Sequence, residues 1–99
     1  MDFEEFWATL QIELGKERSY LTRTNETFFA QYYGNLIHIS LSDGKPYQKI
    51  SKEKMKEIWD LAKGLDDERR FVTTEYSVIT RSASYILPLI DEFNDGEIE

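Results

Sequence analysis

Two short turn signals divide residues 27–50 into three β-prone runs, and they constrain the fold more than any other feature. Gly34-Asn35 separates the first two runs, and Asp43-Gly44 separates the next two. Both dipeptides suit the two-residue turns whose backbone twist matches that of a hairpin. The segment therefore predicts a β-meander in which each turn fixes the pairing of the strands beside it.

The first turn defines two faces of the predicted sheet. A two-residue turn at Gly34-Asn35 places Tyr33 opposite Leu36 and Phe28 opposite Leu41. Side chains alternate along a strand, so each face collects every second residue. The first face carries Phe28, Ala30, Tyr32, Ile37, Ile39 and Leu41. The second face carries Phe29, Gln31, Tyr33, Leu36, His38 and Ser40, and it is half aromatic.

Runs on either side extend the meander to four strands. Residues 19–24 pair with the first run through a turn at Asn25-Glu26, and residues 46–50 pair back on residues 37–41. These pairings place Leu21, Arg23, Gln48 and Ile50 on the first face, and Tyr20, Thr22, Tyr47 and Lys49 on the second. Pro46 has no amide hydrogen to donate, which suits a strand at the sheet edge.

Three other segments have apolar residues at helical spacing. Asp2 is the predicted N-cap of a first helix that stops at Gly15, and Ser51 caps a second that ends at Gly64. The predicted buried stripes are Phe3, Phe6, Trp7, Leu10 and Leu14; Met55, Ile58, Trp59 and Ala62; and Ile79, Ala83, Ile86, Leu89, Ile90 and Phe93.

The region after the second helix is less regular. Residues 65–73 are mostly charged and predict a linking loop or one short helical turn. The last segment runs from about residue 74 to 93 and contains Pro88 and several serines, which weaken a helix. We therefore expect two short helices or a kinked one, broken near residues 80–84.

These elements predict a single α+β domain over residues 1–93, followed by an acidic flexible tail over residues 94–99. The expected order is an N-terminal helix, a four-stranded antiparallel β-meander, a helix and a broken C-terminal helical segment. Four strands about 4.8 Å apart make a sheet under about 20 Å wide, on which roughly two helices fit. A third helix must cover the second face, wrap an edge or pack on another subunit. We expect the C-terminal segment to cover the second face.

Composition limits the chemistry and the setting. The chain has no cysteine, and its first residues are acidic, unlike a signal peptide, so we expect a cytoplasmic protein without a membrane association. One histidine and no cysteine leave the usual nucleophilic triads and zinc sites short of residues. We therefore expect no enzymatic activity, no catalytic residue, no bound metal and no cofactor.

The half-aromatic second face is the best indication of function. An aromatic and apolar surface on a sheet is typical of an interface with another macromolecule. We expect an interaction module that binds a protein partner or forms a homodimer. The candidate binding residues are Tyr20, Phe29, Tyr33, Leu36, His38, Tyr47 and Lys49.

Two alternatives rest on charge. The net charge of −7 opposes nonspecific nucleic-acid binding, yet five lysines cluster locally beside the aromatic residues, as in nucleic-acid-associated accessory domains. This basic patch comprises Lys45, Lys49, Lys52, Lys54 and Lys56. The overall acidity would alternatively suit an inhibitor that mimics the charge of a nucleic acid.

A series of residues also carries a family likeness. They are Phe6, Trp7 and Leu10; Leu21, Thr22 and Thr24; Phe28 or Phe29; Ile37 and Ile39; Gly44; Ile50; Trp59; and the stretch from Arg81 to Ile86. In this order the chain resembles small α+β domains of uncharacterised bacterial proteins, some of them associated with restriction endonucleases. The resemblance implies a bacterial or mobile-element setting and a DNA-related context, and it carries over no catalytic residue.

Overall fold

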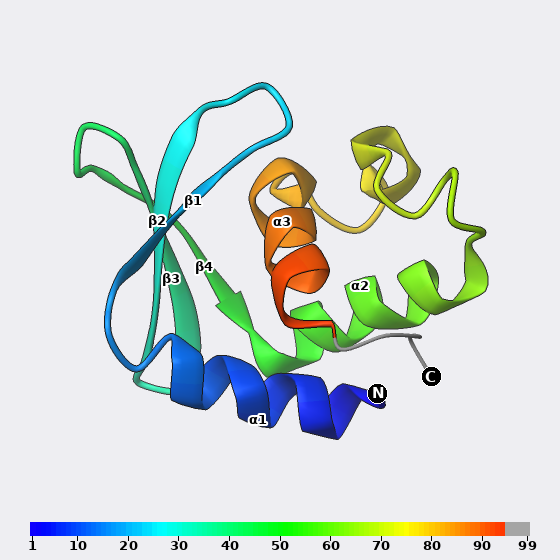
Figure 1. The fold of residues 1–99 in the computed structure, drawn as a ribbon, viewed down its shortest axis with the longest axis horizontal. Helices are drawn as coiled ribbons and strands as arrows, with labels where there is room; N and C mark the ends of the chain where they lie inside the picture. Colours follow the sequence, from blue (N-terminus) through cyan, green and yellow to red (C-terminus); the bar gives the residue numbers. More distant parts are fainter. Residues whose placement is uncertain (95–99) are drawn as a thin grey trace.

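The four strands form one antiparallel sheet in the order β1-β2-β3-β4 in the computed structural model, which describes residues 1–94 (Figure 1). The strands are β1 (Arg18–Leu21), β2 (Thr27–Tyr33), β3 (Leu36–Leu41) and β4 (Pro46–Ser51). The helices are α1 (Phe3–Glu13), α2 (Lys52–Gly64), the short 3-10 helix η1 (Thr73–Tyr76) and α3 (Ala83–Phe93). The predicted α+β order is confirmed. Apart from Asn94, the predicted tail lies outside the described residues.

The central hairpin has the predicted register. Tyr33 lies opposite Leu36, and Phe28 lies opposite Leu41 at the far end. Gly34 and Asn35 have φ values of 59° and 63°, the left-handed values that a type I′ turn requires at both central positions. Turn chemistry and hydrophobic alternation thus select the same pairing.

The register of β1 against β2 differs from the prediction. Tyr20 lies opposite Phe28, so its side chain is on the core face, and Leu21 lies on the other face. The ring of Tyr20 contacts Phe93 of α3, with centroids 6.0 Å apart. An odd shift in register exchanges the two faces of a strand. The placements of Tyr20 on the second face and of Leu21 on the first were therefore wrong.

The cause of the shift is a longer connection than a two-residue turn. Thr22 closes the loop: its carbonyl accepts the amide of Asn25, and its hydroxyl accepts the amide of Glu26. Asn25 takes a left-handed φ of 65° inside this loop. Strand β1 therefore ends at Leu21, and Arg23 lies in the loop, where its guanidinium donates to the carbonyl of Phe71.

A β-bulge interrupts the pairing of β3 with β4. Ile39 lies opposite Gln48, but Ser40 lies opposite Pro46, so Tyr47 is an extra residue in β4. A bulge changes the direction of the side chain at the extra position. The ring of Tyr47 consequently packs on Tyr85 of α3, with centroids 5.0 Å apart. Simple alternation had placed it beside Lys49 on the second face, and the bulge corrects that placement.

The helix boundaries follow their capping residues. The Asp2 carboxylate accepts the amide of Glu5 at 2.9 Å, and the Ser51 hydroxyl accepts the amide of Lys54 at 3.1 Å. The C-terminal segment is broken between η1 and α3, as predicted, whereas Pro88 lies within α3. None of the helices among residues 1–94 has the length and hydrophobicity that crossing a bilayer requires.

All three apolar stripes pack into one core on the first face of the sheet. Phe6 of α1 stacks on Trp59 of α2 with centroids 4.5 Å apart, and Tyr85 of α3 meets Phe28 of β2 edge-on at 5.3 Å. Burial of such aromatic and aliphatic side chains dominates the stability of a domain of this size. The strand residues in this core are Phe28, Ala30, Ile37, Ile39 and Ile50.

No described helix covers the second face, so the expectation that the C-terminal segment would cover it was wrong. Phe29 and Leu36 lie outside the core cluster, whereas their neighbours Phe28 and Ile37 are fully buried. Helices need not lie side by side across a sheet: α1 and α2 bury part of their stripes against each other. Figure 1 shows α1, α2 and α3 together on one side of the sheet.

Candidate functional site

The uncovered surface of the sheet, called the open face below, is the candidate functional site. It contains most of the residues that the sequence placed on the second face, and it gains Leu21 through the shifted register of β1. None of its residues is acidic, although the chain has a net charge of −7. The open face consists of Ser19, Leu21, Thr27, Phe29, Gln31, Tyr33, Leu36, His38, Ser40, Pro46, Lys49 and Ser51.

Tyr33 and His38 form a stacked pair on this face. Their rings are parallel within 2°, with centroids 3.5 Å apart. They occupy diagonal positions on β2 and β3, within reach of aromatic side chains in an antiparallel pair. The His38 ring also donates through Nε2 to the carbonyl of Tyr33, at 3.1 Å. The hydrogen bond orients the His38 ring, and the Tyr33 ring stacks on it, so the pair forms an aromatic wall on an exposed surface.

A hollow lies beside this pair, with a volume of about 670 Å³. It lies next to the β-bulge, where the Tyr47 ring packs on Tyr85 of α3 and Ser40 lies opposite Pro46. Lys49 stands on the neighbouring strand, directly opposite His38. The hollow is lined by Tyr33, His38, Ile39, Ser40, Pro46, Tyr47, Gln48 and Lys49.

The structure thus brings together most of the binding residues predicted from sequence. Tyr33, His38, Tyr47 and Lys49 surround the hollow. Phe29 and Leu36 share the open face with them and are half-buried by their neighbours. Tyr20 belongs to the core face instead. Leu21 was missed as an open-face residue, because only the hydrogen bonds of the Thr22 loop reveal the register of β1.

The predicted basic patch is largely neutralised within the chain. Lys45, Lys52, Lys54 and Lys56 pair with Asp43, Glu4, Glu57 and Asp60, at 3.9, 3.1, 3.3 and 2.7 Å. Lys49 is the one member of the patch without a carboxylate within ion-pair distance among residues 1–94. The five lysines therefore do not form a continuous positive surface, and one cationic group remains on the open face.

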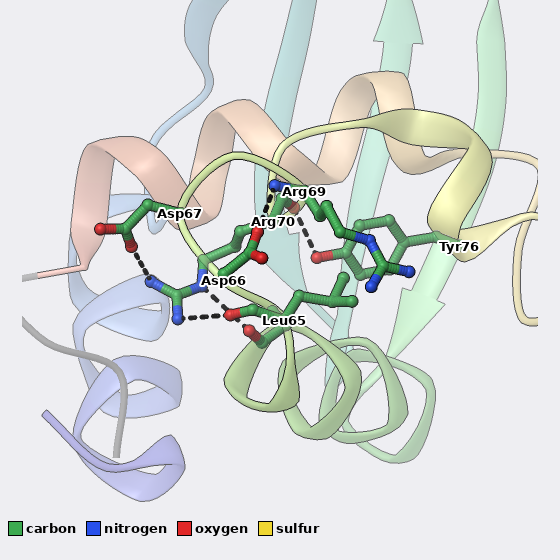
Figure 2. Close-up of polar contacts among 7 residues, drawn as sticks. Leu65, Asp66, Asp67, Arg69, Arg70 and Tyr76 are labelled. Carbon is green, nitrogen blue, oxygen red and sulfur yellow. Dashed lines mark hydrogen bonds and ion pairs between the residues drawn. The ribbon is translucent and has the colours of Figure 1, made fainter.

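A second polar cluster lies in the segment after α2, and Figure 2 shows its contacts. The Arg70 guanidinium donates to the carbonyls of Ala62 and Leu65, both at 2.9 Å, and to the Asp67 carboxylate at 3.1 Å. The Tyr76 hydroxyl donates to the Arg70 carbonyl at 2.6 Å. Burial raises the pKa of Tyr76 to about 12, and the nearby Arg70 charge opposes this rise only in part. With its donors engaged inside the chain, the cluster anchors the linking segment.

From its charged composition, this segment was expected only to be a linking loop or a short helical turn. A general rule could have indicated the contacts of Arg70, because a basic side chain near a helix C-terminus can donate hydrogen bonds to the last carbonyls of the helix. Arg69, Arg70 and Lys63 all meet that description, so spacing alone could not select Arg70.

The open face therefore offers aromatic stacking, hydrophobic contact and a single ammonium group, all of which serve binding. Among residues 1–94, no three acidic or histidine side chains gather as metal ligands. Comparisons of the chain with protein-family models, with curated proteins and with solved structures found no match.

Proposed function

We propose that this chain is a non-enzymatic interaction module that binds protein through its open face, with a second copy of the chain as the partner. The observation that supports the proposal is an apolar sheet surface left uncovered beside a complete core. Leu21 and Tyr33 are 57% and 54% exposed, and half-buried Phe29 and Leu36 share their face. Contiguous exposed apolar surface on a small domain is typical of an interface.

Sheet packing supplies a physical basis for self-association. Two sheets pack face to face about 10 Å apart, with their strand directions within about 30°, and their side chains interdigitate. Two copies of the open face would bury Phe29, Tyr33 and Leu36 in this way. The charge distribution favours the arrangement, because none of the strand residues that form the open face carries a carboxylate.

The setting that we propose is a bacterial or mobile-element cytoplasmic one. It rests on the family resemblance and on the absence of cysteine. The nucleic-acid alternative receives less support, since four of the five patch lysines have carboxylate partners. Phosphate contacts through free lysines would make binding fall steeply with added salt, whereas a hydrophobic dimer is insensitive to salt.

Light scattering over a concentration series tests the proposal. We expect the mass of two chains for the parent protein at both low and high salt. Phe29→Asp and Tyr33→Asp should each give the mass of one chain, because either places an unpaired carboxylate within the buried interface. Ile12→Asp is the matched control, since Ile12 is 77% exposed on α1, away from the sheet. A mass of one chain for the parent at every concentration would eliminate the second copy as partner.

A further inference from the structure

The hollow on the open face has a property that a flat protein interface does not need. Its lining includes the stacked pair of rings, Lys49 and the small polar residue Ser40. A flat sheet surface would suffice for apolar contact with another sheet. Beside the bulge at Tyr47, the open face instead has a concavity of about 670 Å³, within the size range of small-molecule sites.

The aromatic wall of the hollow suits a planar ring. Tyr33 and His38 are already held parallel, 3.5 Å apart, and a hydrogen bond from His38 to the Tyr33 carbonyl supports the pair. A third ring stacked on a preformed pair does not have to immobilise flexible side chains, so less entropy opposes binding. Stacking on an aromatic side chain is favourable for any flat π system, including all nucleobases.

The charge of the hollow suits an anion. Lys49 is the lysine of the patch that has no carboxylate within ion-pair distance among the described residues. Within the described part of the chain, no acidic residue lines the hollow. Lys49 stands opposite His38 in the pairing of β3 with β4, so the ammonium group and the stacked rings border the same space. An anionic group attached to the stacked ring would reach Lys49 without competing with a protein carboxylate.

From these contacts we infer that the hollow binds a planar aromatic anion, with its ring against the Tyr33–His38 pair and its charged group at Lys49. A nucleoside monophosphate and an aromatic carboxylate share this chemistry. The inference does not rest on the proposed dimer, because all lining residues come from one chain, but the two share the open face and Tyr33.

The test is a titration of the full-length ¹⁵N-labelled protein, followed by amide chemical shifts. The probes are adenosine monophosphate and indole-3-acetate, with adenosine as a ring without a charge and inorganic phosphate as a charge without a ring. We expect saturable shifts at residues 38–40 and 46–49 with a Kd below about 1 mM, and binding at least about tenfold weaker for both control compounds. If only one of the two anionic probes saturates the hollow, the result identifies whether the hollow accepts nucleoside monophosphates or aromatic carboxylates.

Variants connect the binding to the hollow. Lys49→Gln should weaken the binding of the anionic probe about fivefold or more, while Lys16→Gln, the same change at an exposed lysine after α1, should leave it unchanged. Ser40→Tyr should abolish binding by filling the hollow, and its amide spectrum will show whether the fold is retained. If Ser40→Tyr unfolds the chain, the affinity of Lys49→Gln alone shows whether the anionic probe binds in the hollow.

Three results would overturn the inference. They are the absence of saturable shifts at the hollow with either anionic probe in both the parent and Phe29→Ser, phosphate binding as tightly as adenosine monophosphate, and equal affinity of the parent and Lys49→Gln. Repeating the titration on Phe29→Ser separates this inference from the proposed dimer, because Phe29 lies on the open face but outside the hollow. Binding by Phe29→Ser but not by the parent would mean that self-association covers a functional hollow.

Discussion

The Tyr76 hydroxyl donates a 2.6 Å hydrogen bond to the backbone carbonyl of Arg70, and this bond joins η1 to the segment that follows α2. The connection is made by the guanidinium of the same arginine, which donates to the carbonyls of Ala62 and Leu65 in the last turn of α2 and just after it. Two side chains therefore anchor a segment that has no regular structure of its own between Leu65 and Val72 (Figure 2).

The buried phenol of Tyr76 predicts a loss of stability in alkali. Burial raises its pKa from 10.0 to about 12, so between these values the unfolded chain loses the phenolic proton while the folded chain keeps it. The folded state then binds more protons, and the free energy of unfolding falls as the pH rises from about 10 to about 12, by on the order of 2 kcal/mol. Burial also raises the pKa of Tyr20 and Tyr85, which adds to the fall.

Urea unfolding at several pH values between 8 and 12 measures this loss, and Tyr76→Phe is the control. The variant should be less stable at pH 8 by about 1–2 kcal/mol, because the Arg70 carbonyl loses its donor. Its stability should then decline less steeply with pH than that of the parent. If the unfolding free energies of the parent and Tyr76→Phe fall equally with pH, a group other than Tyr76 causes the loss of stability in alkali.

Adjacent arginines should differ sharply in their effect on stability. Arg70→Gln should lower the free energy of unfolding by about 2–3 kcal/mol, because it removes charge-assisted bonds to two partly buried carbonyls. Arg69→Gln breaks the ion pair with Glu75, which lies at the surface where solvent screens it, and should lower the stability far less. Denaturant unfolding of the two variants compares them directly, and equal losses would argue against the anchoring role of Arg70.

Two glycines predict opposite effects of the same substitution. Gly44 has a φ of 82°, so Gly44→Ala should destabilise the chain by about 1 kcal/mol although nothing crowds the new methyl group. Gly64 ends α2 without a left-handed φ, and a methyl group there meets nothing within 4 Å. Gly64→Ala should therefore stabilise by about 0.5–1 kcal/mol. Thermal unfolding should move the two midpoints in opposite directions, and shifts of the same sign would contradict the backbone argument.

The N-cap of α2 predicts a local loss of stability. Ser51→Ala removes the oxygen that accepts the Lys54 amide and should cost about 1 kcal/mol. Ser42→Ala, in the exposed turn after β3, is the matched control and should change the unfolding free energy by less than about 0.5 kcal/mol. A Ser51→Ala variant as stable as its control would mean that solvent replaces the cap at no cost.

The local sequence was sufficient to predict strand register and helix position wherever two independent sequence patterns indicated the same structure. At Gly34-Asn35 the turn chemistry and the alternation of the flanking strands select one register, and that register is present. The stripes of α1 and α2 were likewise predictable, because apolar periodicity and the capping residues Asp2 and Ser51 define the same helices.

The local sequence predicted the wrong strand register where only one sequence pattern was available. The Asn25-Glu26 dipeptide is compatible with a short turn, but the Thr22 side chain stabilises a longer loop, and the change reverses the faces of β1. The bulge at Tyr47 has no marker in the local pattern of β4. It is accommodated by contact with Tyr85, which lies far along the chain on α3.

The sequence by itself determined the element types, the central hairpin and the two chemically different faces of the sheet, because these follow from periodicity and turn chemistry over short stretches. Only the tertiary structure decided which residues share the open face, that no described helix covers it, and that four patch lysines meet carboxylates. Those outcomes depend on contacts between distant segments, such as Phe6 with Trp59 and Lys52 with Glu4, which no local pattern encodes.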